Sequence, residues 1–89
     1  MSTPDGPPDV FGVIRDAIAT VLEIDPATVR RDSTFREDLR ADSLALVEMA
    51  EIVEERLAPR AASGFHIDDG DLEDLRTVGD AVDYAVARL

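Results

Sequence analysis

The sequence predicts an all-α protein, a small four-helix bundle made of three main helices and one short helix. Two observations favour this class: apolar residues recur at helical spacing in three segments, and no segment alternates apolar and polar residues as a strand does. The 89 residues form one domain. Because a chain of this size buries only about 60–65% of its unfolded surface, a deep, walled active site is not expected.

The first helix is predicted over residues 9–22, with Asp9 as a plausible N-cap. Residues 1–8 are rich in proline and small polar residues, so they are predicted to form a flexible N-terminal tail before a folded domain over 9–89. The helix carries one apolar stripe, made of Val10, Val13, Ile14, Ala17, Ile18, Val21 and Leu22.

A long connection follows, in which Asp25 and Pro26 interrupt any helix. Three apolar residues, Val29, Phe35 and Leu39, are spaced to fix this connection on the core. The next segment, 43–57, has good helix formers and no glycine or proline, which predicts the second helix. Its expected buried stripe is Leu46, Met49, Ala50, Val53 and Leu57.

The last third of the chain begins with a break, because Pro59 and Gly64 predict a flexible connection. A short helical turn is expected after it, using Ile67, Leu72 and Leu75. Thr77 and Asp80 then resemble a capping box, with aspartate in place of glutamate. The last helix has an apolar stripe made of Val78, Ala81, Val82, Ala85, Val86 and Leu89.

Composition limits the function. Twenty acidic residues face nine arginines and no lysine, and the net charge of -11 opposes binding to nucleic acid and to anionic membranes. An acidic surface either binds partners with basic patches or simply keeps the protein soluble. There is no cysteine, no secretory signal and no apolar run long enough for a bilayer, so we expect a cytoplasmic protein.

No metal site is predicted. The acidic residues around Gly70 do not form a calcium loop, because placing Gly70 sixth puts Phe65 first and Ile67 third. The single histidine, His66, has no partner at metal-ligand spacing and is interpreted as a surface residue. No pair of carboxylates is singled out for acid–base chemistry.

Ser43 is the residue of greatest interest, and two interpretations of it are open. A hydrolytic nucleophile is disfavoured, because "RADSLA" lacks the glycines of a nucleophile elbow and His66 is the only candidate base. Serine before a helix is a favoured N-cap. The start of a helix also favours a covalently attached phosphate, so Ser43 as a cap and Ser43 as a modified residue are both possible.

The second helix also has an apolar pair outside its buried stripe. Leu44 and Val47 are expected beside four carboxylates, an arrangement that resembles the apolar centre and charged rim of a transient interface. Isolated exposed apolar residues are also common, which is the alternative. The carboxylates are Glu48, Glu51, Glu54 and Glu55.

Several motifs together resemble those of the acyl carrier proteins. "EDLRADSL" (37–44) is similar to the carrier signature in which aspartate, serine and leucine open the second helix, and "VE" with further acids follows it. The resemblance spans about residues 10–89, including "STFREDL" in the first loop and "LRTVGDAVDYAV" at the end. It implies a helical carrier without catalytic activity of its own, so we expect a non-enzyme.

The resemblance also implies the site. Ser43 is the implied attachment point for 4'-phosphopantetheine, which a separate phosphopantetheinyl transferase takes from coenzyme A and whose thiol carries acyl groups as thioesters. Asp42 flanks the site. Partner enzymes such as a ketosynthase and an acyltransferase are expected to dock on the second helix, through Leu44, Val47, Glu48, Glu51, Glu54 and Glu55. We expect a monomer that serves fatty-acid or polyketide biosynthesis, with a lean towards polyketides.

This chain departs from the family pattern at a few positions. Arg40 stands where many members have glycine, Glu51 where many have an apolar residue, and Asp68 where proline is common. The connection between Leu57 and Ile67 is several residues longer than in compact members. These departures bear on partner choice and on the geometry after the second helix.

Two further expectations concern cargo. Small residues such as Ala45 and Ala50 could leave room for an acyl chain beside the second helix. The rival functions are a peptidyl carrier loaded with an amino acid, which the acidic second helix disfavours, and an unmodified acidic helical adaptor in which Ser43 is only a cap.

Overall fold

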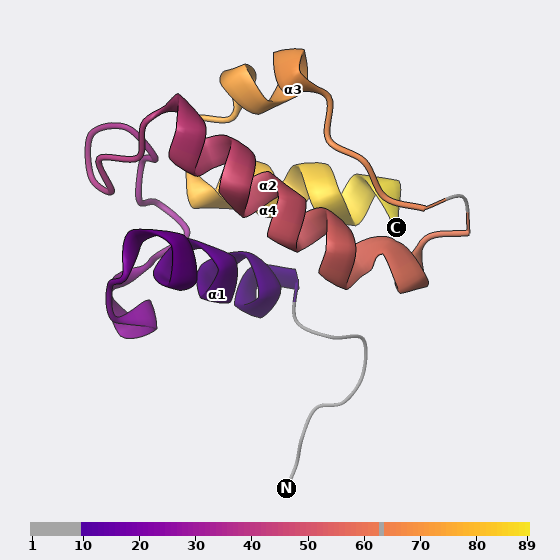
Figure 1. The fold of residues 1–89 in the computed structure, drawn as a ribbon, viewed down its shortest axis with the longest axis horizontal. Helices are drawn as coiled ribbons and strands as arrows, with labels where there is room; N and C mark the ends of the chain where they lie inside the picture. The colour runs from indigo at the N-terminus through magenta and orange to yellow at the C-terminus, as the bar shows by residue number, and fades with distance from the viewer. Residues whose placement is uncertain (1–9, 63) are drawn as a thin grey trace, which may run out of the picture.

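Four α-helices form the part of the chain that the computed structural model describes, residues 10–62 and 64–89 (Figure 1). They are α1 (Val10–Leu22), α2 (Ser43–Leu57), α3 (Asp69–Asp74) and α4 (Val78–Arg88). Two short 3-10 turns lie at Pro26–Thr28 and Ala58–Arg60, and these described ranges contain no strand. The prediction of three main helices and one short helix is confirmed. The predicted tail and the predicted cap Asp9 lie outside the described residues.

The three long helices enclose the core. α1 packs against both α2 and α4, while the short α3 lies over the α2 side of the bundle (Figure 1). Ile18, Leu57 and Val78 are fully buried, one from each long helix. All five residues of the stripe predicted for α2 are buried. The helical period of α2 therefore located its inner face correctly.

The stripe predicted for α4 is too wide at its end. Val78, Val82 and Ala85 are buried, but Val86 is 55% exposed and Leu89 is 43% exposed. At 3.6 residues per turn, each step of four residues moves the side chain about 40° further around the helix, so Val86 has rotated away from the core. Leu89 follows the last helical residue.

α1 ends in a closing turn before the predicted break. Glu23 adopts a left-handed φ of 57°, and the amide of Ile24 donates a hydrogen bond to the carbonyl of Ala19, at 3.1 Å. This is the six-residue closure of a Schellman motif. Asp25 then caps the 3-10 turn through the amide of Ala27, at 2.9 Å. The helix therefore stops ahead of Pro26.

The first loop is fixed to the start of α4. Val29 and Phe35 are buried as predicted, and Leu39 is partly buried against the core. Backbone hydrogen bonds join Phe35 to Arg76 and Val78 to Ser33, and the amide of Gly79 donates to Arg31 at 2.7 Å. A Cβ on Gly79 would lie only 3.1 Å from that Arg31 oxygen, so the close approach favours glycine.

The N-terminus of α4 carries the predicted capping box. The Thr77 hydroxyl accepts a hydrogen bond from the Asp80 amide, and the Asp80 carboxylate accepts one from the Thr77 amide. Asp80 also accepts a hydrogen bond from the amide of Arg76. Aspartate thus performs the role of the usual glutamate.

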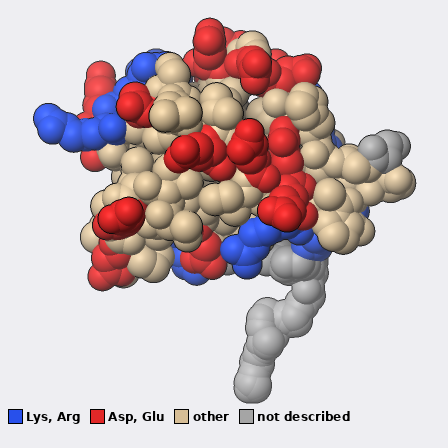
Figure 2. All heavy atoms as spheres, viewed as in Figure 1, with Lys and Arg blue, Asp and Glu red and all other residues tan. Residues whose placement is uncertain are grey.

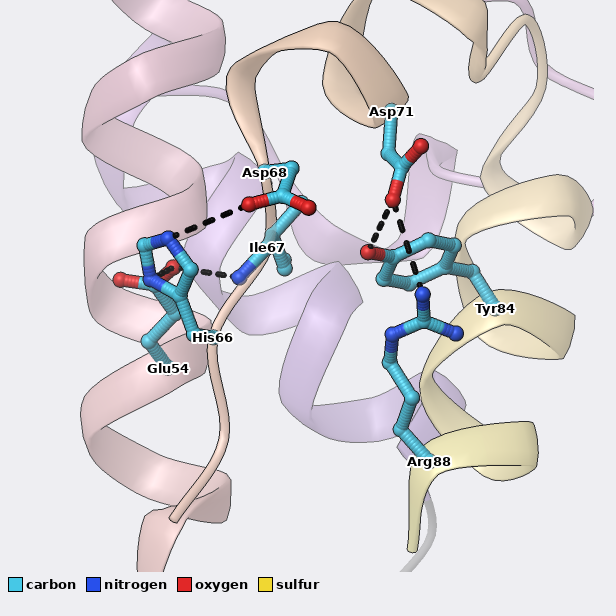
Figure 3. Close-up of polar contacts among 7 residues, drawn as sticks. All are labelled: Glu54, His66, Ile67, Asp68, Asp71, Tyr84 and Arg88. Atoms are coloured by element: carbon cyan, nitrogen blue, oxygen red, sulfur yellow. Dashed lines mark hydrogen bonds and ion pairs between the residues drawn. The ribbon is translucent and has the colours of Figure 1, made fainter.

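The last residues of the long connection after α2 bind back to that helix. Phe65 and Ile67 are buried on either side of the exposed His66. The Glu54 carboxylate accepts a hydrogen bond from the Ile67 amide at 2.7 Å and lies 3.0 Å from Nδ1 of His66 (Figure 3). His66 is on the surface, as predicted, and its neighbours are Glu54 and, at 3.7 Å, Asp68.

α3 is joined to α4 through side chains. The Tyr84 hydroxyl donates a hydrogen bond to Asp71, and Arg88 lies 3.5 Å from the same carboxylate (Figure 3). The Arg88 guanidinium also stacks over the Tyr84 ring, 3.8 Å from its centre. Three residues from two helices thus form one compact cluster beside the bundle.

Candidate functional site

The loop that leads to Ser43 is closed by its own polar residues. Thr34 and Asp38 exchange two hydrogen bonds, each from a backbone amide to the other's side chain, at 2.9 Å. The amide of Ala41 donates to the carbonyl of Phe35 at 2.8 Å, and both side chains are buried. The loop therefore delivers Ser43 to a fixed position at the start of α2.

Asp42, rather than Ser43, is the N-cap of α2. Its carboxylate accepts a hydrogen bond from the Ala45 amide at 2.9 Å, while Ser43 is the first helical residue. The interpretation of Ser43 as the cap is therefore wrong. Aspartate caps as well as serine does, and the amide three residues after it is the usual partner, so either residue fitted the sequence.

The Ser43 side chain is available. The residue is exposed, and its hydroxyl forms no hydrogen bond with any residue in the described ranges. Because Asp42 caps the helix, Ser43 has no structural task there. Its hydroxyl can be modified without removing a bond that holds the fold.

Arg40 occupies a left-handed backbone conformation with a φ of 59°. Such a φ costs most residues about 1–2 kcal/mol, whereas glycine adopts it readily. The position is the one where many family members carry glycine. Arg40 therefore adopts this left-handed turn at the expense of backbone strain.

The outer face of α2 combines apolar and acidic side chains. Leu44 is 67% exposed and Val47 is 40% exposed, as predicted. Glu48, Glu51 and Glu55 are exposed on the same helix. Figure 2 shows acidic side chains gathered over α2 and α3 on the face that it views.

Glu54 is placed differently from the other predicted docking residues. Its side chain is only 22% exposed, because its carboxylate binds Ile67 and His66 in the connection that follows α2. The structure therefore brings five of the six predicted partner-binding residues to the open face and turns Glu54 towards the connection that follows α2. The sequence could not indicate this, since the contact spans thirteen residues.

The interior offers little ready space for an acyl chain. A cavity of about 30 Å³ lies between the helices, and its walls include Ala50, Met49 and Ile67. Ala45 is not among the residues that line it. Because this volume suits only a group of about the size of two or three waters, a longer cargo would have to move core side chains. Sheltering of cargo stays a prediction.

Arg36 was not identified from the sequence. It is exposed next to the buried Phe35, and it lines a surface cavity together with Ser43. The alternation of a buried and an exposed residue in "FR" could have indicated the direction of the side chain. It could not have indicated that α3 forms the opposite wall.

The described residues contain no group of three or more histidines and acids placed to hold a metal ion. None of their helices is both long and apolar enough to span a bilayer.

Comparisons with known proteins show which class of protein this chain resembles. The family model described as "Phosphopantetheine attachment site" matches residues 12–85. A protein named "Acyl carrier protein" from Chlamydia trachomatis serovar D is 41% identical over 75 residues, which cover 84% of this chain and 90% of that protein. Relatives of the same name from Chlamydia muridarum and Chlamydia caviae are 40% and 39% identical, with the same coverage.

The fold and these similarities define a phosphopantetheine-dependent carrier. More particularly, the chain belongs to the acyl carrier protein family. It carries acyl groups on a covalently attached 4'-phosphopantetheine, and the family works with synthase enzymes and phosphopantetheinyl transferases. The resemblance recognised in the motifs is thereby confirmed. The matched residues lie inside the domain predicted over 9–89, whose boundaries stay a prediction.

Proposed function

We propose that Ser43 is the residue that holds the 4'-phosphopantetheine arm. The supporting observation is the division of roles at the start of α2: Asp42 caps the helix, and the neighbouring Ser43 hydroxyl is exposed and unbonded. The chemistry of the site fits the group. A hydroxyl can form the phosphodiester, and the guanidinium of Arg36 shares a surface cavity with it.

Attachment requires little of this chain. The Ser43 hydroxyl loses its proton to the transferase, and its Oγ forms the bond to the phosphorus next to pantetheine. The phosphoanhydride bond of coenzyme A breaks, and adenosine 3',5'-bisphosphate leaves. Asp42 stays on the Ala45 amide, where it holds the reacting residue at the helix start. The attached group supplies a terminal thiol for thioester chemistry, which a chain without cysteine lacks.

The open face of α2 is the proposed docking surface for partner enzymes. Leu44 and Val47 provide an apolar centre, and Glu48, Glu51 and Glu55 provide an acidic rim. Such a surface fits a basic patch that has an apolar pocket, and its charges speed encounter more than they tighten binding. The transferase, a ketosynthase and an acyltransferase are the partners we propose. Glu54 acts beside this surface, by fixing the connection that follows α2.

The proposed protein is a monomeric carrier and not a catalyst. Nucleophile, base and oxyanion donors are supplied by the partners that visit the arm. We propose that the partners belong to fatty-acid or polyketide biosynthesis. Assays of the loaded protein with ketosynthases of each kind would assign the pathway, and transfer by neither kind would contradict it.

The attachment is tested by mass spectrometry. Wild type is incubated with coenzyme A, magnesium and a broad-specificity transferase, next to Ser43→Ala and Ser33→Ala. Ser33 is a matched serine in the same loop, but it is buried. Wild type and Ser33→Ala should gain one phosphopantetheine and one thiol, while Ser43→Ala should gain neither. Equal gains in wild type and Ser43→Ala would sink the assignment, and no gain in wild type would favour the unmodified adaptor.

The same preparation separates the carrier types. The loaded protein is offered malonyl and aminoacyl donors with their respective loading enzymes. An acyl carrier accepts the malonyl group. Exclusive loading with an amino acid would instead identify a peptidyl carrier.

A further inference from the structure

Beside Ser43 lies a surface cavity of about 170 Å³. A single buried water needs only about 10–15 Å³ measured in this way, so the cavity can hold a group of several atoms. Its walls come from three parts of the chain: the first loop, the first turns of α2, and α3. The residues that line it are Arg36, Ser43, Leu46, Val47, Asp69, Leu72 and Glu73.

The wall of this cavity has more negative than positive side chains. Arg36 is its only cation, and it faces two carboxylates, Asp69 and Glu73. Arg36 is exposed, and within residues 10–62 and 64–89 its side chain forms no ion pair. A second surface cavity, of about 140 Å³, also has Arg36 in its wall. Arg36 thus lines both cavities, and its guanidinium has no ion-pair partner among the described residues.

We infer that Arg36 positions the prosthetic arm by pairing with its phosphodiester. The inference rests on the proposed attachment at Ser43. A phosphodiester on Ser43 brings one negative charge to a cavity that already holds two carboxylates, and without a cation it would be repelled. Arg36 offsets that repulsion, because a guanidinium binds phosphate oxygens through two parallel hydrogen bonds.

The remaining walls suit the next part of the arm. The phosphate of phosphopantetheine is followed by one methylene and then by a carbon that bears two methyl groups. Leu46, Val47 and Leu72 form the apolar part of the cavity. The charge and the methyl groups of the arm thus match a cavity whose wall has both a cation and apolar side chains.

The pairing has a consequence for delivery. Arg36 holds only the first segment of the arm, so the distal thiol keeps its reach while the base of the arm leans towards α3. The pair lies at the surface and is screened by salt, so the arm is released from the cavity as ionic strength rises. A partner that offers its own cation to the phosphate would release it in the same way.

The test compares the unmodified and the modified protein by NMR. Arg36→Gln and Arg40→Gln are the paired variants, since both remove an exposed arginine from the same loop and Arg40 is absent from the cavity wall. On conversion of wild type, the side-chain Nε–H signal of Arg36 should shift and that of Arg40 should not. High salt should reverse the shift. The phosphorus line of the modified protein should narrow in Arg36→Gln only, because the phosphate becomes more mobile.

The outcomes separate the two proposals. Without a mass gain on Ser43 there is no modified protein, and the attachment and the pairing both fail. With a mass gain but an unshifted Arg36 signal, the attachment stands and the pairing is overturned. Equal narrowing of the phosphorus line in both variants would overturn it as well, because a general loss of positive charge would then explain the effect.

Discussion

The hydroxyl of Tyr84 donates a hydrogen bond to the carboxylate of Asp71 at 2.7 Å, and through this bond α4 holds α3 (Figure 3). α3 has only six residues and no side-chain cap, so its own stability is small. Arg88 supports the bond by stacking on the ring and pairing with the same carboxylate. This cluster is therefore one of the contacts that hold α3, which forms one wall of the Ser43 cavity.

Tyr84→Phe should loosen α3. The variant keeps the ring under Arg88 and removes only the hydroxyl, so the free energy of unfolding should fall by about 1 kcal/mol. Urea unfolding measures the loss, and amide exchange should rise most in α3. Asp83→Asn, on the exposed side of the same helix, should stay within about 0.5 kcal/mol. Unchanged exchange in α3 of Tyr84→Phe would contradict the role given to this bond.

Alkaline pH should weaken the protein through the same tyrosine. Burial raises the pKa of Tyr84 above its ordinary value of 10.0, and the hydrogen bond to Asp71 adds to the rise, while the charge of Arg88 opposes it. Because the folded pKa is the higher one, the stabilisation is complete below pH 10 and is lost as the pH rises through the folded pKa. Arginine stays charged there, and the chain has neither lysine nor cysteine.

Two measurements check this pH dependence. Tyrosinate absorbance of the folded protein should titrate at a higher pH than that of the urea-unfolded chain, which has the same single tyrosine. The free energy of unfolding should fall above pH 10 in wild type and stay level in Tyr84→Phe. A parallel fall in both proteins would assign the alkaline loss to something other than Tyr84.

Glu54→Ala should release the connection that follows α2. The variant removes the acceptor of the Ile67 amide and the partner of His66, with an expected loss of about 1 kcal/mol. Glu54→Gln should lose less, because its amide oxygen still accepts the Ile67 hydrogen bond. Glu55→Ala is the exposed control. Amide exchange at Ile67 is the direct measurement, and equal exchange rates in all three variants would show that the bond does not hold the connection.

Arg40→Gly should stabilise the loop before α2. Glycine relieves the left-handed φ of 59° but loses more entropy on folding, so we expect a net gain of at most about 1 kcal/mol. Arg40→Ala removes the same charge and keeps the strained backbone, which makes it the matched control. In thermal and urea unfolding, Arg40→Gly should have a higher melting temperature and a larger free energy of unfolding than Arg40→Ala. Equal stability of the two would mean that charge, and not backbone conformation, decides the effect.

Asp42→Ala should cost about 1 kcal/mol, because the first turn of α2 loses its cap. Asp42→Asn should retain most of the stability, since its amide oxygen can accept the same Ala45 hydrogen bond. Ser43→Ala should change the free energy of unfolding by less than about 0.5 kcal/mol. A loss in Ser43→Ala as large as that in Asp42→Ala would return the capping role to the serine.

The sequence predicted most of the helical framework because the signals are local. The period of Leu46, Met49 and Val53 located the buried face of α2, and Thr77 with Asp80 marked the start of α4. Leu44 and Val47 were recognised as exposed because they fall off that period. Choices between adjacent residues were harder, since Asp42 and Ser43 are equally good caps and only the backbone decides between them.

The rest could not be predicted because it depends on contacts between distant segments. Glu54 turns away from the proposed docking surface only because the connection after α2 returns its Ile67 amide to that helix. Arg36 and Ser43 line one cavity with residues of α3, a helix that Tyr84 and Arg88 contact through Asp71. Neither relationship has a local sequence signature.

Asp42 caps α2, and the Ser43 hydroxyl takes part in none of the hydrogen bonds that hold the described fold. Asp42 therefore matters for folding, and Ser43 is free for a later modification. A newly made chain can complete its folding before any transferase arrives, since the first turn of α2 forms its hydrogen bonds without the arm that we propose for Ser43. Hydrolysis of the phosphodiester would likewise return a folded, unmodified protein that a transferase can modify again.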